Sequence, residues 1–121
     1  MKIIVYDLKG KSRMNLGQML SENSLIDDYQ MFDDYSDFLI SASASAPALC
    51  LVRLGLDGMS GLEIGHQISM IDNNIKIIFM YDNGDYAVDA FETGASGYLL
   101  YPIKKEKLEK IIQNTKERQK K

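Results

Sequence analysis

Residues Leu49–Ile64, LCLVRLGLDGMSGLEI, contain the pattern that decides the fold. The short apolar run Leu49–Val52 predicts a buried strand. A glycine-containing loop follows it, and a helix starts at Ser60-Gly61. Strand, loop and helix in this order form half of a parallel βαβ unit, in which ligands bind at the carboxyl end of the strand. Arg53 stands at that end, so a long cation occupies the expected ligand position.

The same alternation of strands and helices runs through the rest of the chain. Further strands are predicted at residues 2–6, 29–32, 75–80 and 98–100, and a helix follows each strand. Ser36 is the expected N-cap of the second helix, and the run 41–46 (SASASA) is expected to end that helix as a small-residue loop. The fourth helix is expected between residues 83 and 94, capped by Asn83 or Asp85. Five strands alternating with five helices predict an α/β fold, a doubly wound, flavodoxin-like sandwich around a five-stranded parallel sheet.

Composition restricts the classes of function. The 121 residues suffice for one domain, and the net charge of −3 gives no reason to expect direct contact with nucleic acid. The single cysteine, Cys50, excludes a disulfide within the chain and is expected to be buried and unreactive. No apolar run is long enough for a membrane span and no signal peptide is recognisable, so we expect a cytoplasmic protein without membrane contact.

In a flavodoxin-like strand order, the functional edge collects the carboxyl ends of the first, third, fourth and fifth strands. The residues at those ends are Asp7-Leu8, Arg53, Tyr81-Asp82 and Tyr101.

Several motifs, in order along the chain, match one family. GMSGLEI (58–64), IIF (77–79) and AFETGASGYLLYPI (90–103) resemble response-regulator receiver domains, the CheY-like family, and the resemblance covers the whole chain. The segment 85–103 is most similar to receivers that precede a LytTR-type DNA-binding domain. The resemblance implies a three-layer CheY-like sandwich and a role in two-component signal transduction and transcription regulation.

Receivers of this family carry a phosphoryl group on an aspartate at the end of the third strand, and that position is Arg53 here. An acidic pair that binds Mg²⁺ falls on Asp7 and Leu8, so one carboxylate is lost. The hydroxyl residue after the fourth strand falls on Tyr81, with Asp82 at the small residue that follows. The lysine after the fifth strand falls on Tyr101, and the loop proline after the phosphoacceptor falls on Asp57. The resemblance therefore implies a degenerate phosphorylation pocket.

The chemistry of these replacements predicts a changed function. A guanidinium has no lone pair with which to accept a phosphoryl group, and a single carboxylate beside a fixed cation makes a poor Mg²⁺ site. We therefore expect no catalytic residue and no cofactor, with Mg²⁺ binding lost or weak. Asp57 and Asp82 are the alternative source of metal-binding carboxylates. We expect Arg53 to form a salt bridge with Asp7, shared with Asp82; the alternative is that Arg53 extends into solvent.

Aromatic residues indicate an interaction surface. Tyr98 matches the aromatic residue that changes rotamer when receivers are activated, and Tyr86 lies in the preceding helix. With the hydroxyl trigger replaced by Tyr81, Tyr98 is predicted to be a fixed core or interface residue. Tyrosines are enriched at protein interfaces, so we expect a protein partner or a homodimer through the fourth helix, fifth strand and fifth helix. The only histidine, His66, is expected to be exposed, without a role at a metal or as a base.

The sequence leads to three alternatives for function. The preferred one is a phosphorylation-independent pseudo-receiver, in residues 1–117, that acts as a dimerisation module of a transcriptional regulator. Residues 118–121 would be a basic tail that leads to a fused DNA-binding domain beyond Lys121, or simply a solubilising end. The second alternative is a ligand- or ion-sensing module that uses the altered pocket. An enzyme or flavodoxin-like electron carrier is disfavoured, because Asp7–Ser12 contains too little glycine to cradle a phosphate.

Overall fold

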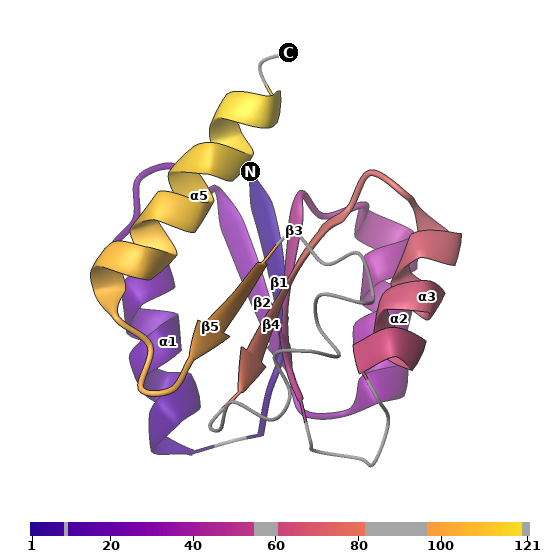
Figure 1. Ribbon diagram of the computed structural model, residues 1–121, viewed down its shortest axis with the longest axis horizontal. Coiled ribbons are helices and arrows are strands. Elements are labelled where there is room, and N and C mark those ends of the chain that lie inside the picture. Colours follow the sequence, from indigo (N-terminus) through magenta and orange to yellow (C-terminus); the bar gives the residue numbers. More distant parts are fainter. Residues whose placement is uncertain (9, 55–60, 82–96, 120–121) are drawn as a thin grey trace.

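The computed structural model describes residues 1–8, 10–54, 61–81 and 97–119. Five strands form one sheet: β1 (Lys2–Tyr6), β2 (Asp28–Phe32), β3 (Leu49–Arg53), β4 (Lys76–Tyr81) and β5 (Gly97–Leu100). The pairings are all parallel, and the strand order is β2-β1-β3-β4-β5 (Figure 1). The chain changes direction along the sheet between β1 and β3, which is where open α/β sheets bind ligands.

The described helices cover both faces of the sheet (Figure 1). One face is covered by α1 (Lys11–Ser21) and α5 (Lys105–Gln119). The other face is covered by α2 (Tyr35–Ser45) and α3 (Gly61–Ile71). The result is a three-layer sandwich, as the sequence predicts.

Alternate strand residues supply the two halves of the core. Ile3 and Val5 of β1 pack on the α1 and α5 side, whereas Ile4 and Tyr6 pack on the α2 and α3 side. Cys50 of β3 is fully buried, as predicted, and this burial raises the pKa of its thiol to about 12. Strands that are apolar on both faces hold the backbone at their carboxyl ends in fixed positions.

The predicted fold class is confirmed, and each predicted strand matches the observed one to within one residue at either end. The helix expected between residues 83 and 94, with its capping residues, lies outside the described residues.

Two predictions for α2 are wrong. The N-cap is Asp34 rather than Ser36, because the Asp34 carboxylate accepts a hydrogen bond of 3.0 Å from the backbone N–H of Asp37. The SASASA run does not form a loop but continues the helix to Ser45, and Ala46 ends it in the left-handed conformation. Alanine favours the helix, and Ala42 is fully buried against the sheet, so packing extends α2 through the run.

α5 continues as a helix to Gln119, into the residues predicted to form a tail. The division of the chain at residue 117 stays a prediction. None of the described helices has the length and apolar composition that crossing a membrane requires.

Candidate functional site

The carboxyl ends of four strands meet at one edge of the sheet. Arg53 ends β3 and pairs in register with Met80, next to Tyr81 at the end of β4. Tyr101 follows β5, and its backbone N–H donates to the carbonyl of Tyr81 at 2.8 Å. Asp7 follows β1, and its N–H donates to the carbonyl of Phe32 at 3.0 Å. Backbone pairing therefore continues past the strands and holds Asp7, Arg53 and Tyr101 in place.

Asp7 is the centre of this site. Its side chain is almost completely buried, 3% exposed. Its Oδ2 accepts a hydrogen bond of 2.6 Å from the hydroxyl of Tyr101. Its Oδ1 accepts a bond of 2.8 Å from the backbone N–H of Leu8 and lies 3.6 Å from a guanidinium nitrogen of Arg53. Both carboxylate oxygens thus have partners within the chain.

Arg53 completes a closed cluster with Asp7 and Tyr101. Its guanidinium carbon lies 3.9 Å from the centre of the Tyr101 ring, a cation–π contact. The side chain is 17% exposed, so Arg53 does not extend into solvent and the predicted salt bridge to Asp7 is confirmed. The predicted sharing of Arg53 with Asp82 lies outside the described residues, as do Asp57 and Tyr86.

Tyr101 has two roles that the sequence did not indicate. Its hydroxyl donates to Asp7, and its ring packs against Arg53. Burial, and next the hydrogen bond to Asp7, raise the pKa of Tyr101, so the phenol stays protonated and remains a donor. A phenol combines a hydrogen-bond donor with an aromatic face. The sequence could therefore have indicated that Tyr101 contacts both Asp7 and Arg53, because all three follow or end strands at the same edge of the sheet.

None of the cluster contacts described above involves a side chain at the other predicted positions that the structure describes, although the backbone N–H of Leu8 donates to Asp7. Tyr81 is buried, and its ring centre is 5.5 Å from that of Tyr98. Burial, and then the proximity of Tyr98, raise the pKa of Tyr81. Tyr98 is 37% exposed and Leu8 is 56% exposed. The predicted exposure of His66 on α3 is confirmed.

The described part of the site does not fit a Mg²⁺ ion. Mg²⁺ takes several hard oxygen ligands, usually including carboxylates. Asp7 is the one carboxylate in the cluster, and its oxygens are bonded to Tyr101 and Leu8 and paired with Arg53. Within residues 1–8, 10–54, 61–81 and 97–119, no three acidic, histidine or cysteine side chains gather in a way that could hold a metal.

Known proteins with similar sequences are regulators. "Sensory transduction protein LytR" of Staphylococcus epidermidis is 26% identical over 112 residues, which are 93% of this chain and 44% of that protein. "Transcriptional regulatory protein LytR" of Staphylococcus aureus is 24% identical over 93% of this chain and 46% of that protein. The chain thus spans about half the length of the curated relatives it matches.

Solved structures support the fold. The response regulatory domain of protein mrkE from Klebsiella pneumoniae superposes with a TM-score of 0.82 at 22% identity, covering 96% of this chain and 95% of that one. The signal receiver domain of a DNA-binding response regulator from Colwellia psychrerythraea gives a TM-score of 0.81 at 24% identity, covering 96% of this chain and 97% of that one.

The family model of the response regulator receiver domain matches residues 3–113. This match includes every described strand except the first residue of β1, and it includes all members of the Asp7 cluster. The chain therefore belongs to the response regulator receiver domain family and is homologous to LytR-type regulators.

Proposed function

We propose that this receiver domain is a pseudo-receiver, which signals through protein contacts and not through a phosphoryl group. The proposal rests on the closed cluster of Asp7, Arg53 and Tyr101. Tyr101 donates to Asp7 at 2.6 Å, and Arg53 lies 3.6 Å from the other oxygen of the same carboxylate. Arg53 and Asp7 occupy positions at which the resemblance implies the phosphoryl group and its Mg²⁺.

This cluster lacks two chemical groups that phosphoryl transfer needs. The reaction needs an oxygen nucleophile and a cation such as Mg²⁺ that neutralises charge on the transferred group. Arg53 supplies no nucleophile, because its nitrogens are donors only. Mg²⁺ would have to displace Arg53 and Tyr101 from Asp7 and would then find one carboxylate among the described residues of the cluster. We assign the domain no catalytic step.

The cluster is suited to hold the described strand ends of this edge in one arrangement. A buried ion pair adds little net stability, but removing either partner is costly because the other charge stays buried. Tyr101 connects the end of β5 to the end of β1, and Arg53 adds the end of β3. A receiver whose strand ends are connected in this way would keep one conformation of its contact surface and would not switch between two.

The surface we propose for protein contacts includes β5 and α5. Tyr98 is 37% exposed and Leu100 is 51% exposed, and both lie on β5. The Tyr98 ring packs at 5.5 Å from Tyr81, whose burial fixes one side of the exposed aromatic. Exposed large apolar side chains next to one another favour an interface, and we propose a homodimer through the fourth helix, β5 and α5.

In the whole protein, we propose that this module regulates transcription. The relatives include a transcriptional regulatory protein, and the chain spans 44–47% of the first three relatives. A DNA-binding domain that follows residue 121 would contact the nucleic acid, while the receiver domain would contact protein. We therefore propose that the protein works in the cytoplasm, where its target DNA would be.

A beryllofluoride titration followed by amide NMR tests the absence of phosphorylation. Beryllofluoride with Mg²⁺ mimics a bound phosphoryl group, so the spectrum of this domain should not change. The matched control is the double variant Leu8→Asp with Arg53→Asp, which restores carboxylates at both positions. Saturable shifts at Asp7, Leu54 and Tyr81 in the original domain would overturn the proposal.

Sedimentation velocity tests the proposed dimer. Tyr98→Ala with Leu100→Ser should weaken self-association at least tenfold, because interface aromatics often contribute about 1.4 kcal/mol or more. Met70→Ser is the matched control, since Met70 is 76% exposed but lies on α3, on the other face of the sheet. A monomer at high concentration, or equal dimerisation by both variants, would contradict a homodimer through β5.

A further inference from the structure

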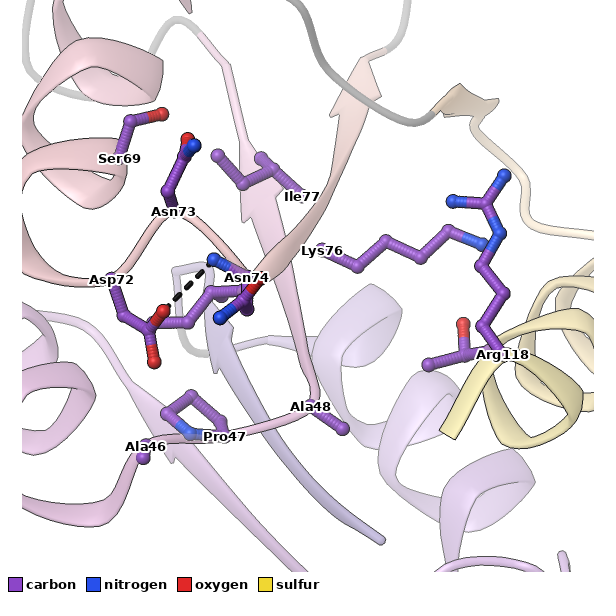
Figure 2. A pocket seen from close by; sticks show the side chains of 12 residues that line it. Ala46, Pro47, Ala48, Ser69, Asp72, Asn73, Asn74, Lys76, Ile77 and Arg118 are labelled. Carbon is purple, nitrogen blue, oxygen red and sulfur yellow. Dashed lines mark hydrogen bonds between the residues drawn. The ribbon is translucent and has the colours of Figure 1, made fainter. Parts of the chain in front are cut away.

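A second polar pocket lies at the opposite edge of the sheet from Asp7. Its volume is about 550 Å³. The segment before β3, the loop before β4 and the end of α5 form its walls (Figure 2). Because these segments precede parallel strands, the pocket lies at the amino edge of the sheet. It shares no residue with the Asp7 cluster and is independent of the proposed function.

Two cations come together in this pocket. Lys76 is the first residue of β4, and Arg118 lies in the last turns of α5. Figure 2 shows the Lys76 side chain extended toward the side chain of Arg118. Burial, and in second place the charge of Arg118, lower the pKa of Lys76. The fold therefore places two like charges side by side across residues far apart in the sequence.

No carboxylate among the described residues compensates this pair. Neither Lys76 nor Arg118 forms a salt bridge within residues 1–8, 10–54, 61–81 and 97–119. Asp72 also lines the pocket, but it lies on the side away from the two cations (Figure 2). Its Oδ1 accepts a hydrogen bond of 2.8 Å from the backbone N–H of Asn74 and so belongs to its own turn.

We propose that this pocket binds a small oxyanion, a phosphate or carboxylate group, between Lys76 and Arg118. A guanidinium offers a planar fork of donors to such a group, and an ammonium adds a compact charge. The exposed hydroxyl of Ser69 and the amide of Asn73 are polar groups of the far wall, on the side of Asp72 (Figure 2). A bound oxyanion would remove the repulsion and connect the beginning of β4 to the end of α5.

Amide NMR titrations at constant ionic strength test this site with inorganic phosphate in one arm and malonate in the other. We expect saturable shifts at Asn74, Lys76 and Arg118, with a dissociation constant on the order of 1 mM for two charge-assisted contacts. The arm that saturates identifies the phosphate or the carboxylate group as the ligand. Sodium chloride at the same ionic strength is the reference, and the same shifts with chloride would overturn the proposal.

Charge-removing variants test the role of each cation. Lys76→Gln and Arg118→Gln should each raise the dissociation constant about tenfold, since each removes one charge-assisted contact. Lys107→Gln is the matched control, because Lys107 is an exposed lysine of the same helix as Arg118. An unchanged amide spectrum outside the pocket verifies folding. Equal binding by Lys107→Gln and the two pocket variants, or no saturation in either arm, would overturn the site.

Discussion

The Asp7 cluster at the carboxyl edge of the sheet and the Lys76–Arg118 pair at the amino edge differ in how their cations are compensated. At the carboxyl edge, Arg53 has a buried carboxylate at 3.6 Å and an aromatic ring at 3.9 Å. At the amino edge, Lys76 faces Arg118, and no described carboxylate pairs with either. Arg53 is compensated by groups of the chain itself and so stabilises one arrangement of the strand ends. The charges of Lys76 and Arg118 can instead be compensated by an anion from solution. The position at which receivers normally bind their ligand is thus closed by partners within the chain, whereas the site between Lys76 and Arg118 is open.

The largest effect should come from breaking the closed cluster with Asp7→Ala. This change removes the Asp7 carboxylate from the mostly buried Arg53 and from the hydroxyl of Tyr101. Removing one partner of a buried pair costs about 3 kcal/mol or more, and we expect a loss near 3 kcal/mol in the free energy of unfolding measured with urea.

The double variant Asp7→Ala with Arg53→Met is the control for this loss. It removes both charges and keeps an apolar side chain of similar length, so it should recover most of the stability. Equal losses in the single and the double variant would show that Arg53 does not depend on Asp7, and the contrast between the two edges would fail.

Tyr101→Phe separates the hydroxyl from the ring. The phenylalanine ring can still pack against Arg53, but the hydrogen bond of 2.6 Å to Asp7 is lost. A hydrogen bond to a charged group contributes about 1.5–3 kcal/mol, and Tyr101 is partly exposed, so we expect a loss of about 1.5 kcal/mol at pH 7. An unchanged free energy of unfolding in urea would contradict the role of the hydroxyl.

The same variant has a signature at alkaline pH. Burial first, and the bond to Asp7 second, raise the pKa of Tyr101 above its ordinary value of 10.0. Above pH 10 the unfolded phenol loses its proton while the folded one keeps it, so stability falls as the pH rises. The wild type should lose up to about 1.4 kcal/mol per pH unit from this group, and Tyr101→Phe should not. Urea titrations between pH 9 and about pH 11 should therefore show that the free energies of unfolding of the wild type and of Tyr101→Phe converge. If the two free energies fell in parallel with pH, the protonated role of Tyr101 would be contradicted.

Sequence patterns predicted the sheet well because its strands are apolar on both faces. Short runs that are apolar throughout, such as residues 2–6 and 49–52, are typical of buried parallel strands. The Arg53–Asp7 pair was predictable too, since opposite charges at neighbouring strand ends meet at one edge. The start of α2 was not, because Ser36 and Asp34 are both good N-caps, and only the structure shows that Asp34 accepts the capping hydrogen bond from Asp37.

The contacts of Tyr101 and the cation pair could not be read from the sequence for another reason. The direction of the Tyr101 side chain depends on the backbone after β5, where the N–H of Tyr101 donates to the carbonyl of Tyr81. Lys76 and Arg118 are ordinary lysine and arginine residues in their local context. Only the packing of the end of α5 near the beginning of β4 makes them neighbours.

We expect the smallest effect for Lys76→Gln. This variant tests most directly the difference between the Asp7 cluster and the Lys76–Arg118 pair. Removing one of two adjacent like charges relieves repulsion, so stability in low salt should rise by a few tenths of a kcal/mol, a value discounted for solvent screening. In 1 M NaCl the Debye length falls to about 3 Å and this gain should vanish. The loss caused by Asp7→Ala should persist in the same salt, because a buried pair is screened much less. Urea unfolding of both variants at the two salt concentrations measures this difference. If Lys76→Gln destabilises the protein at low salt, the amino edge already has a compensating partner for Lys76, and the two edges are alike.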